Sequence, residues 1–261
     1  MITFGLIGYG GIAQSIISKL KDEDFRPNNT GILVRKSNKH KENHSFVNDI
    51  SQLIKFRPRA IVECASHSAL HEYGEEVLNS GIDLIVLSIG ALANENLNNR
   101  LVSAASNNRA KIIIPAGAVG AIDALSASRL AGLKKVLYRS RKPPIAWKGT
   151  PAEEVTDLDN MKEAQTIFKG TVGQAALRFP KNTNSAAAVA LAGLGFKKTE
   201  AELIADPNAH GNIHEIAVEA KSGCFVLSLT GYPSPANPKT SMLTANSVVR
   251  TLLAYINPVV I

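Results

Sequence analysis

The sequence lacks the features that mark membrane, secreted or disulfide-stabilised proteins. It has no run of eighteen apolar residues, and no basic segment precedes an apolar one at its start, so we expect a cytoplasmic protein with no membrane partner and nothing removed. Only two cysteines, Cys64 and Cys224, are present, and they lie far apart in the sequence. This argues against a disulfide framework or a zinc ribbon. We expect both to be small buried side chains.

Aromatic residues are also scarce, at 5% of the chain, and the net charge is +7. The two together decide whether the chain is expected to bind nucleic acid. A basic chain can bind nucleic acid, but here the basic residues are scattered and no nucleic-acid motif accompanies them. We therefore expect no nucleic-acid partner. The length of 261 residues and the 45% hydrophobic content suffice for one large domain or two medium ones.

A glycine-rich turn, Gly8-Tyr9-Gly10-Gly11-Ile12-Ala13, follows an apolar run and opens a helical pattern. In a dinucleotide-binding turn, Gly8 permits the sharp bend, Gly10 lets the backbone approach a pyrophosphate, and Ala13 lets the helix pack on the strand. The N–H groups at the helix start, from Gly11 and Ile12 onward, then hold the anion. The competing interpretation is an ordinary structural turn, but the strand before it and the helix after it favour dinucleotide binding.

Strand and helix patterns alternate over the first half of the chain and predict a Rossmann-type α/β fold, a doubly wound parallel sheet. Five strands are expected, at residues 2–7, 31–34, 60–65, 83–89 and 110–114. We assign residues 1–119 to a dinucleotide-binding domain, completed by a C-terminal helix in residues 239–261. That helix is expected to start at Thr240 and to place Met242, Ala245, Val249, Leu252 and Ile256 on one face.

From Leu133 the periodicity changes, and residues 120–238 are predicted to form a second, α+β domain that carries the substrate site. Thr171 and Gln174 form a capping box for one helix, and Asn184 with Ser185 is expected to cap the next. Strands are predicted at residues 202–205, 213–220 and 224–229.

Arg35 and Lys36 follow the second predicted strand, where NAD-specific folds carry an acidic side chain. Arginine there can hold the 2′-phosphate of NADP. We therefore expect NADP to be accepted beside NAD. Ligands in such sheets lie beyond the carboxyl ends of the strands, so four loops are expected to face one crevice: residues 8–13, 65–68 (with Ala65 and Ser66), 88–91 and 115–120. The last loop either lies against the nicotinamide ring or is an ordinary strand-to-helix turn.

The six histidines fall in three pairs with four-residue spacing, a spacing that can bind zinc on a helix. No glutamate directly follows the first histidine of a pair, and no cysteine or carboxylate completes a site, so we expect no metal. His214 differs, because on a strand it shares an apolar face with Ile216 and Val218. It is either a satisfied core histidine or a general acid/base at the rim of a crevice.

Two lysines precede predicted helix starts, where backbone N–H groups already favour a carboxylate. These are Lys181, before Asn184, and Lys239, before Thr240. They either hold a substrate anion or are ordinary surface lysines.

Seven blocks of the sequence, in order along the chain, resemble the L-aspartate dehydrogenase family. They are Glu63 to His67, Leu84 to Leu92, Pro115 to Gly120, Phe179 to Asn184, Ala205 to Asn208, Asn212 to Ile216, and Asn237 to Ser241. The resemblance implies a homodimeric oxidoreductase that converts L-aspartate with NAD or NADP to iminoaspartate, which water hydrolyses to oxaloacetate and ammonia. It also implies the reverse amination and, by analogy, a place in NAD synthesis.

The resemblance also implies roles for single residues. The catalytic histidine of the family falls on His214, and its cofactor-contacting alanine and asparagine fall on Ala118 and Asn184. Lys181, Asn182, Lys239 and Thr240, in two of the matching blocks, are the candidates for substrate binding. Ala116 stands where serine is common, which leaves the fine structure of the substrate pocket open.

Two other functions would use the same fold. Another NADP-dependent C=N or C=O reductase would share the glycine turn but not the block from Asn212 to Ile216. A non-catalytic NADP-binding regulator would bind the cofactor without turnover.

Overall fold

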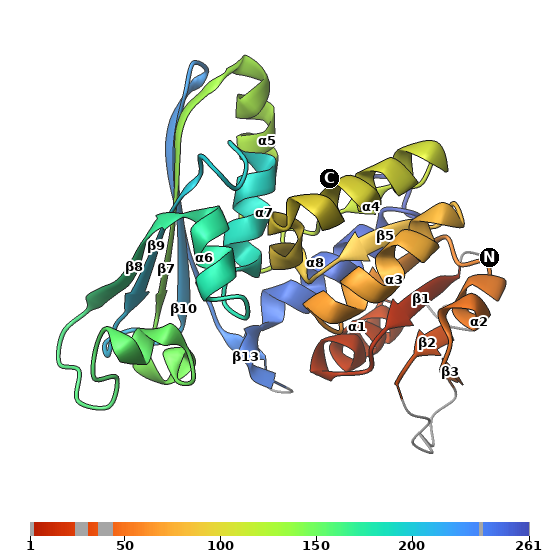
Figure 1. Cartoon of the computed structure of the whole chain (residues 1–261), viewed down its shortest axis with the longest axis horizontal. Helices are drawn as coiled ribbons and strands as arrows, with labels where there is room; N and C mark the ends of the chain where they lie inside the picture. Colours follow the sequence, from red (N-terminus) through yellow and green to blue (C-terminus); the bar gives the residue numbers. More distant parts are fainter. Residues whose placement is uncertain (1–2, 24–30, 36–43, 235–236, 261) are drawn as a thin grey trace. The chain divides into compact units, whose positions relative to one another are not determined.

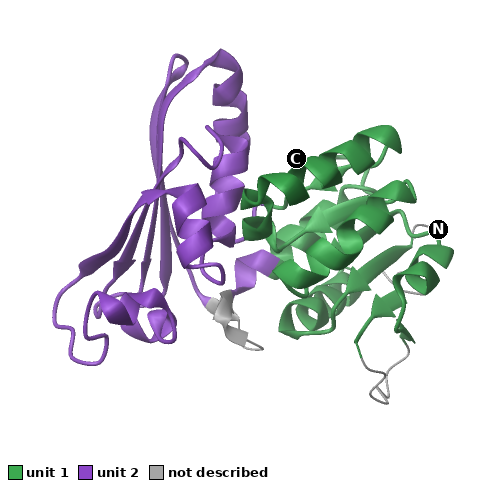
Figure 2. Ribbon diagram, in the orientation of Figure 1, with its two compact units in different colours: residues 1–115, 245–261 green, residues 116–244 purple. Residues whose placement is uncertain are grey.

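The computed structural model describes residues 3–23, 31–35, 44–234 and 237–260, with only the backbone described at 233–234 and 237–240. The chain divides into two compact units, one of residues 1–115 with 245–261 and the other of residues 116–244 (Figure 2). No helix in the described ranges is long and apolar enough to cross a membrane.

The first unit contains a six-stranded parallel sheet in the order β3-β2-β1-β4-β5-β6 (Figure 1). Its strands are β1 (Phe4–Ile7), β2 (Gly31–Leu33), β3 (Ser45–Val47), β4 (Ala60–Glu63), β5 (Asp83–Val86) and β6 (Ile112–Ile113). This strand order is that of the Rossmann fold. The predicted doubly wound parallel sheet is therefore confirmed.

Helices cover both faces of this sheet. Successive residues of each strand point to opposite faces, so each strand contacts helices on both sides. Phe4, Leu6 and Val62 pack against α1 (Gly11–Asp22) and α8 (Met242–Leu253) in one core cluster. Gly5 and Gly31 point the other way, where a Cβ on either would meet Leu53 of α2 (Ile50–Lys55). The same face carries α3 (His67–Asn79), and α4 (Glu95–Asn107) packs on α3.

The sheet has one strand more than the sequence patterns indicated. The extra strand, β3, has only three residues and follows a polar stretch, so it lacks the length and the periodicity that identify a strand. At the opposite edge, β6 has only two residues, shorter than predicted.

The second unit is built on a five-stranded mixed sheet in the order β11-β10-β7-β9-β8 (Figure 1). Its strands are β7 (Leu133–Lys142), β8 (Gln165–Thr171), β9 (Glu200–Ala205), β10 (Asn212–Ala220) and β11 (Gly223–Gly231). The helices α5 (Ile122–Ala131), α6 (Val172–Arg178) and α7 (Asn184–Ala192) pack on one face of it. The predicted α+β character is confirmed, as is the capping box of Thr171 and Gln174.

Two 3₁₀ helices, η2 (Pro144–Trp147) and η3 (Pro151–Glu154), follow β7. They place Trp147 in a second small core with Phe179 and Leu203. The Trp147 indole donates a hydrogen bond to the carbonyl of Ile204, 3.1 Å away. This anchors the end of β7 next to β9.

A short antiparallel pair, β12 (Pro233–Ser234) and β13 (Asn237–Ser241), precedes α8. The predicted helix start at Thr240 is therefore two residues early, because Thr240 still lies within the strand β13 and α8 begins at Met242. Ala245, Val249 and Leu252 are buried as predicted. Met242 and Ile256 are exposed: Met242 is the first residue of α8, and Ile256 lies beyond its last residue, Leu253.

The two cysteines differ in environment. The Cys64 thiol lies 3.4 Å from the carbonyl oxygen of Ile7, and burial raises its pKa. The expectation that Cys224 is buried is wrong. It lies on the edge strand β11, whose residues alternate, so Cys224 points away from the helices while Phe225 packs toward them.

Candidate functional site

The turn between β1 and α1 has the geometry of a phosphate cradle. Gly8 has a φ of +99°, and a Cβ there would lie 2.9 Å from the Cβ of Ala65, so only glycine fits. Gly10 is the N-cap of α1, with an ordinary φ of −85° and no side-chain cap among the described residues. A Cβ on Gly10 would meet nothing within 4 Å. The space beside Gly10 at the start of α1 is therefore open, and a helix N-terminus of this kind fits an anionic ligand.

Ala13 itself is fully buried in the core beneath the turn. Gly8 donates its N–H to the carbonyl of Leu33, 2.9 Å away, which joins the turn to the end of β2. The small side chain at position 13 and the positive φ at position 8 thus serve the close packing that a dinucleotide-binding turn requires.

Glu63, at the end of β4, organises the neighbouring loops, a role that the sequence patterns did not predict. Its fully buried carboxylate accepts hydrogen bonds from the N–H groups of Ala65 and Ser66, both at 2.9 Å. It also accepts the N–H and the hydroxyl of Ser88, both at 3.0 Å. Burial raises its pKa, and these hydrogen bonds oppose that rise. An acidic residue in an otherwise apolar strand was the signal that could have identified it.

Two of the predicted cofactor residues, Ala65 and Ser66, belong to this network. Ser66 is the N-cap of α3, and its hydroxyl accepts the N–H of Ala69 at 3.2 Å. Arg35 follows β2 and is exposed. Lys36 lies outside the described residues.

His214 lies on β10 in the second unit, and only 3% of its surface is exposed. It shares the helix-facing side of the sheet with Ile216 and Val218, as the alternation predicted. Its Nδ1 is 2.7 Å from the hydroxyl of Tyr138 on the adjacent strand β7. The two rings are stacked with centroids 6.0 Å apart.

The charge state of this pair follows from its burial. Burial, and to a lesser extent the charge of Lys142, lower the pKa of His214 to about 3. Burial also raises the pKa of Tyr138, while the Ser140 and Ser185 hydroxyls work against that rise. At neutral pH the imidazole and the phenol are therefore both uncharged, so a ring nitrogen of His214 has a lone pair available for a proton.

The remaining candidates differ in exposure. Ala118 is buried in the turn before α5, Lys181 is exposed, and the amide of Asn182 donates to the carbonyl of Ala146 at 3.4 Å. Asn184 is the first residue of α7 and not its cap, because Thr183 occupies the N-cap position. The side chains of Lys239 and Thr240 lie outside the described residues.

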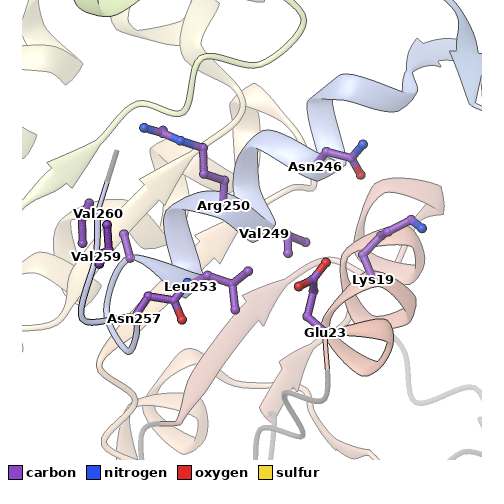
Figure 3. Close-up of a pocket in the computed structure, with 10 residues that line it drawn as sticks. Lys19, Glu23, Asn246, Val249, Arg250, Leu253, Asn257, Val259 and Val260 are labelled. Carbon is purple, nitrogen blue, oxygen red and sulfur yellow. The ribbon is translucent and has the colours of Figure 1, made fainter.

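A separate pocket of about 460 Å³ lies in the first unit between α1 and α8 (Figure 3). Lys19 of α1 and Glu23, its C-cap, line it on one side, and Asn246, Val249 and Arg250 line it from α8. It contains none of the candidate residues. Within the described part of the chain, no three side chains of histidine, cysteine, aspartate or glutamate gather as metal ligands would.

Comparison with known proteins assigns the family. Residues 123–255 match the family model described as aspartate dehydrogenase, C-terminal, and residues 8–115 match the NAD-binding domain of homoserine dehydrogenase. An L-aspartate dehydrogenase of Ralstonia nicotianae is 50% identical over 75% of this chain and 73% of that protein. That of Ralstonia pickettii is 40% identical over 97% of each chain.

A solved structure agrees with these matches. The crystal structure of aspartate dehydrogenase from Thermotoga maritima superposes with a TM-score of 0.82 and 26% identity, and the match covers 100% of this chain and 99% of that one. The chain belongs to the L-aspartate dehydrogenase family.

Proposed function

We propose that the protein is an NAD(P)-dependent L-aspartate dehydrogenase. In the oxidative direction, L-aspartate, water and NAD(P)⁺ give oxaloacetate, ammonia and NAD(P)H with a proton, and the reverse reaction is an amination. The observation that carries this proposal is the buried, uncharged His214 held by Tyr138, in the region that matches the aspartate dehydrogenase family model.

The glycine turn would hold the cofactor. Gly8 permits the tight turn against Ala65, Gly10 leaves space for the pyrophosphate, and the amides of Gly11, Ile12 and Ala13 would hold the anion. Ala65, Ser66, Ala118 and Asn184 are proposed as further cofactor contacts. When bound, the nicotinamide supplies the acceptor for a hydride from the substrate Cα.

His214 would act as the general base. If its Nδ1–H donates to the Tyr138 hydroxyl, Nε2 is left with a free lone pair. Nε2 would take a proton from the water that attacks the imine carbon of iminoaspartate, and would return it in the amination direction. Lys181, Asn182, Lys239 and Thr240 are proposed to hold the substrate, whose two carboxylates must be anchored before transfer.

We propose that Arg35 and Lys36 allow NADP to bind as well as NAD. Arg35 is exposed at the end of β2, where a guanidinium can pair with a 2′-phosphate. Replacing both residues with alanine should weaken NADP binding and leave the dissociation constant of NAD unchanged. Equal effects on the two cofactors would remove the basis of this proposal.

The finer expectations also remain proposals. Residues 120–238 would carry the substrate site and the contacts of a cytoplasmic homodimer, and iminoaspartate would feed NAD synthesis. Light scattering of the purified protein tests the dimer. Growth of a strain that requires quinolinate, with and without this protein, tests the supply of iminoaspartate.

The test of the main proposal is a panel of L-amino acids with NAD⁺ and with NADP⁺, run beside oxaloacetate with ammonia and reduced cofactor. Turnover confined to aspartate and oxaloacetate supports the proposal and identifies the preferred cofactor. Turnover on a different substrate would favour another reductase of this fold. Cofactor binding without any turnover would favour a non-catalytic regulator.

A further inference from the structure

A lysine stands beside His214 on the same face of the second sheet. His214 pairs with Ser140 across β10 and β7, so Tyr138 and Lys142 are its two diagonal neighbours on the strand β7. Diagonal neighbours in a sheet lie about 7 to 8 Å apart, which long side chains span. The charge of Lys142 reaches His214, since it contributes to the lowered pKa of the imidazole.

Lys142 has no acidic partner within the described ranges of the chain. The carboxylate of Asp206, the residue after the paired strand β9, is hydrogen-bonded at 2.8 Å to Arg141, which points to the opposite face of the sheet. The Lys142 ammonium instead lies 5.2 Å from the centre of the Trp147 ring. Burial lowers its pKa to about 8.

An ammonium in this setting is costly to the fold, since burial of a charge without a counterion disfavours the folded state. Trp147 compensates in part through a cation–π contact and fixes the direction of the side chain. No anion among the described residues pairs with the Lys142 ammonium. A carboxylate placed between Lys142 and His214 would supply one.

We propose that Lys142 binds a carboxylate of the dicarboxylate substrate and thereby places the substrate next to His214. This inference rests on the proposed function for the identity of the substrate, and it assigns to Lys142 a role in selecting dicarboxylic over neutral amino acids. Trp147 is then a positioning residue that acts through Lys142.

The experiment measures binding of succinate, which has both carboxylates of aspartate but no amine to oxidise. Calorimetry is run on the wild-type protein saturated with oxidised cofactor, on K142M and on K169M. Lys169 is an exposed lysine of the same sheet and serves as the matched control. We expect K142M to bind succinate at least 30-fold more weakly and to raise the KM for aspartate by a similar factor. K169M should match the wild type in succinate binding and in the KM for aspartate. The dissociation constant of the cofactor should be unchanged in both variants.

A second readout separates a bound carboxylate from a structural effect. At pH 9 the Lys142 amine is largely deprotonated, and an adjacent carboxylate raises its pKa, so succinate binding should take up close to one proton per site. His214, the titratable group facing it from β10, stays neutral throughout, and Asp206 and Arg141 remain paired. The uptake should be absent in K142M, whose melting temperature should equal or exceed that of the wild type. K142R, which keeps the charge, should bind succinate at least fivefold more tightly than K142M.

If K142M binds succinate with the same affinity as K169M, the inference is wrong. It is also wrong if the wild-type protein binds no succinate. The outcome is independent of turnover. If the wild type fails to oxidise aspartate while K142M selectively loses succinate, the proposed function fails and the carboxylate site stands.

Discussion

The hydroxyl of Tyr138 lies 2.7 Å from Nδ1 of His214, and both side chains are buried on neighbouring strands of one sheet. A histidine can use one nitrogen for proton transfer only if the other is held in a defined tautomer. Tyr138 supplies a hydrogen-bond partner for Nδ1 of His214. If Nδ1 carries the proton, this arrangement leaves Nε2 free for the proton transfer that we propose.

The Y138F variant should lose turnover more than substrate affinity. Removing the phenol hydroxyl leaves a buried imidazole nitrogen without its partner, at a cost of about 1 to 3 kcal/mol. If that cost raises the activation free energy of the bound substrate by the same amount, kcat drops roughly 5- to 150-fold. Steady-state kinetics with aspartate measure this, and cofactor binding should be unaffected. A wild-type kcat in Y138F would show that the hydrogen bond does not position His214.

The H214A variant should lose most turnover, about 10²- to 10⁴-fold, because general acid–base catalysis contributes on that scale. It should keep normal cofactor affinity, measured by fluorescence titration of the reduced cofactor. Near-normal turnover would refute the role assigned to this residue.

Stability should fall as the pH is lowered from 7 to 5. The pKa of His214 is about 3 in the folded state and 6.5 in its ordinary state, so the unfolded chain binds an additional proton in this window. Protonation therefore favours unfolding, by about 2 kcal/mol at pH 5 from this residue alone. Urea unfolding of the wild type and H214Q at both pH values gives the difference. An equal loss of unfolding free energy in the wild type and in H214Q between pH 7 and pH 5 would contradict this prediction.

G10A and G8A form a matched pair for the cofactor turn. In G10A the added methyl meets open space at an ordinary φ, so the free energy of unfolding should change by no more than about 1 kcal/mol. The methyl would occupy the approach of the pyrophosphate, and cofactor affinity should fall at least tenfold. G8A should instead unfold more easily, by at least about 1 kcal/mol, because its φ is positive and its methyl would contact Ala65. Unchanged cofactor affinity in G10A would mean that the turn is only structural.

E63Q should destabilise the first unit and weaken cofactor binding. The amide NH₂ of glutamine would face a backbone or hydroxyl donor that the carboxylate now satisfies, which costs about 1 to 3 kcal/mol. Thermal unfolding and cofactor titration measure the two effects. S88A, which removes only the hydroxyl bonded to Glu63, is the control and should show a smaller loss in both.

Much of the fold could be predicted because its signals are local. The strand, glycine turn and helix at Gly8 to Ala13 are contiguous, and the alternation of residues along β10 is enough to place His214 on the apolar face. The capping box at Thr171 is equally local. The short strand β3 was not predicted, because three residues are too few to show the alternating pattern of a strand.

The sequence by itself thus determined the type of the first sheet, the glycine turn between β1 and α1, and the position of the candidate base. Only the tertiary structure decided the partners of that base: Tyr138 is 76 positions away from His214, and Lys142 and Trp147 reach the site through the pairing of β7 with β10. The register between two strands depends on which faces are buried across the whole sheet, and a one-residue shift would turn Tyr138 and Lys142 to the opposite face. No periodicity within either strand encodes that choice, because it arises from packing between segments far apart in the chain.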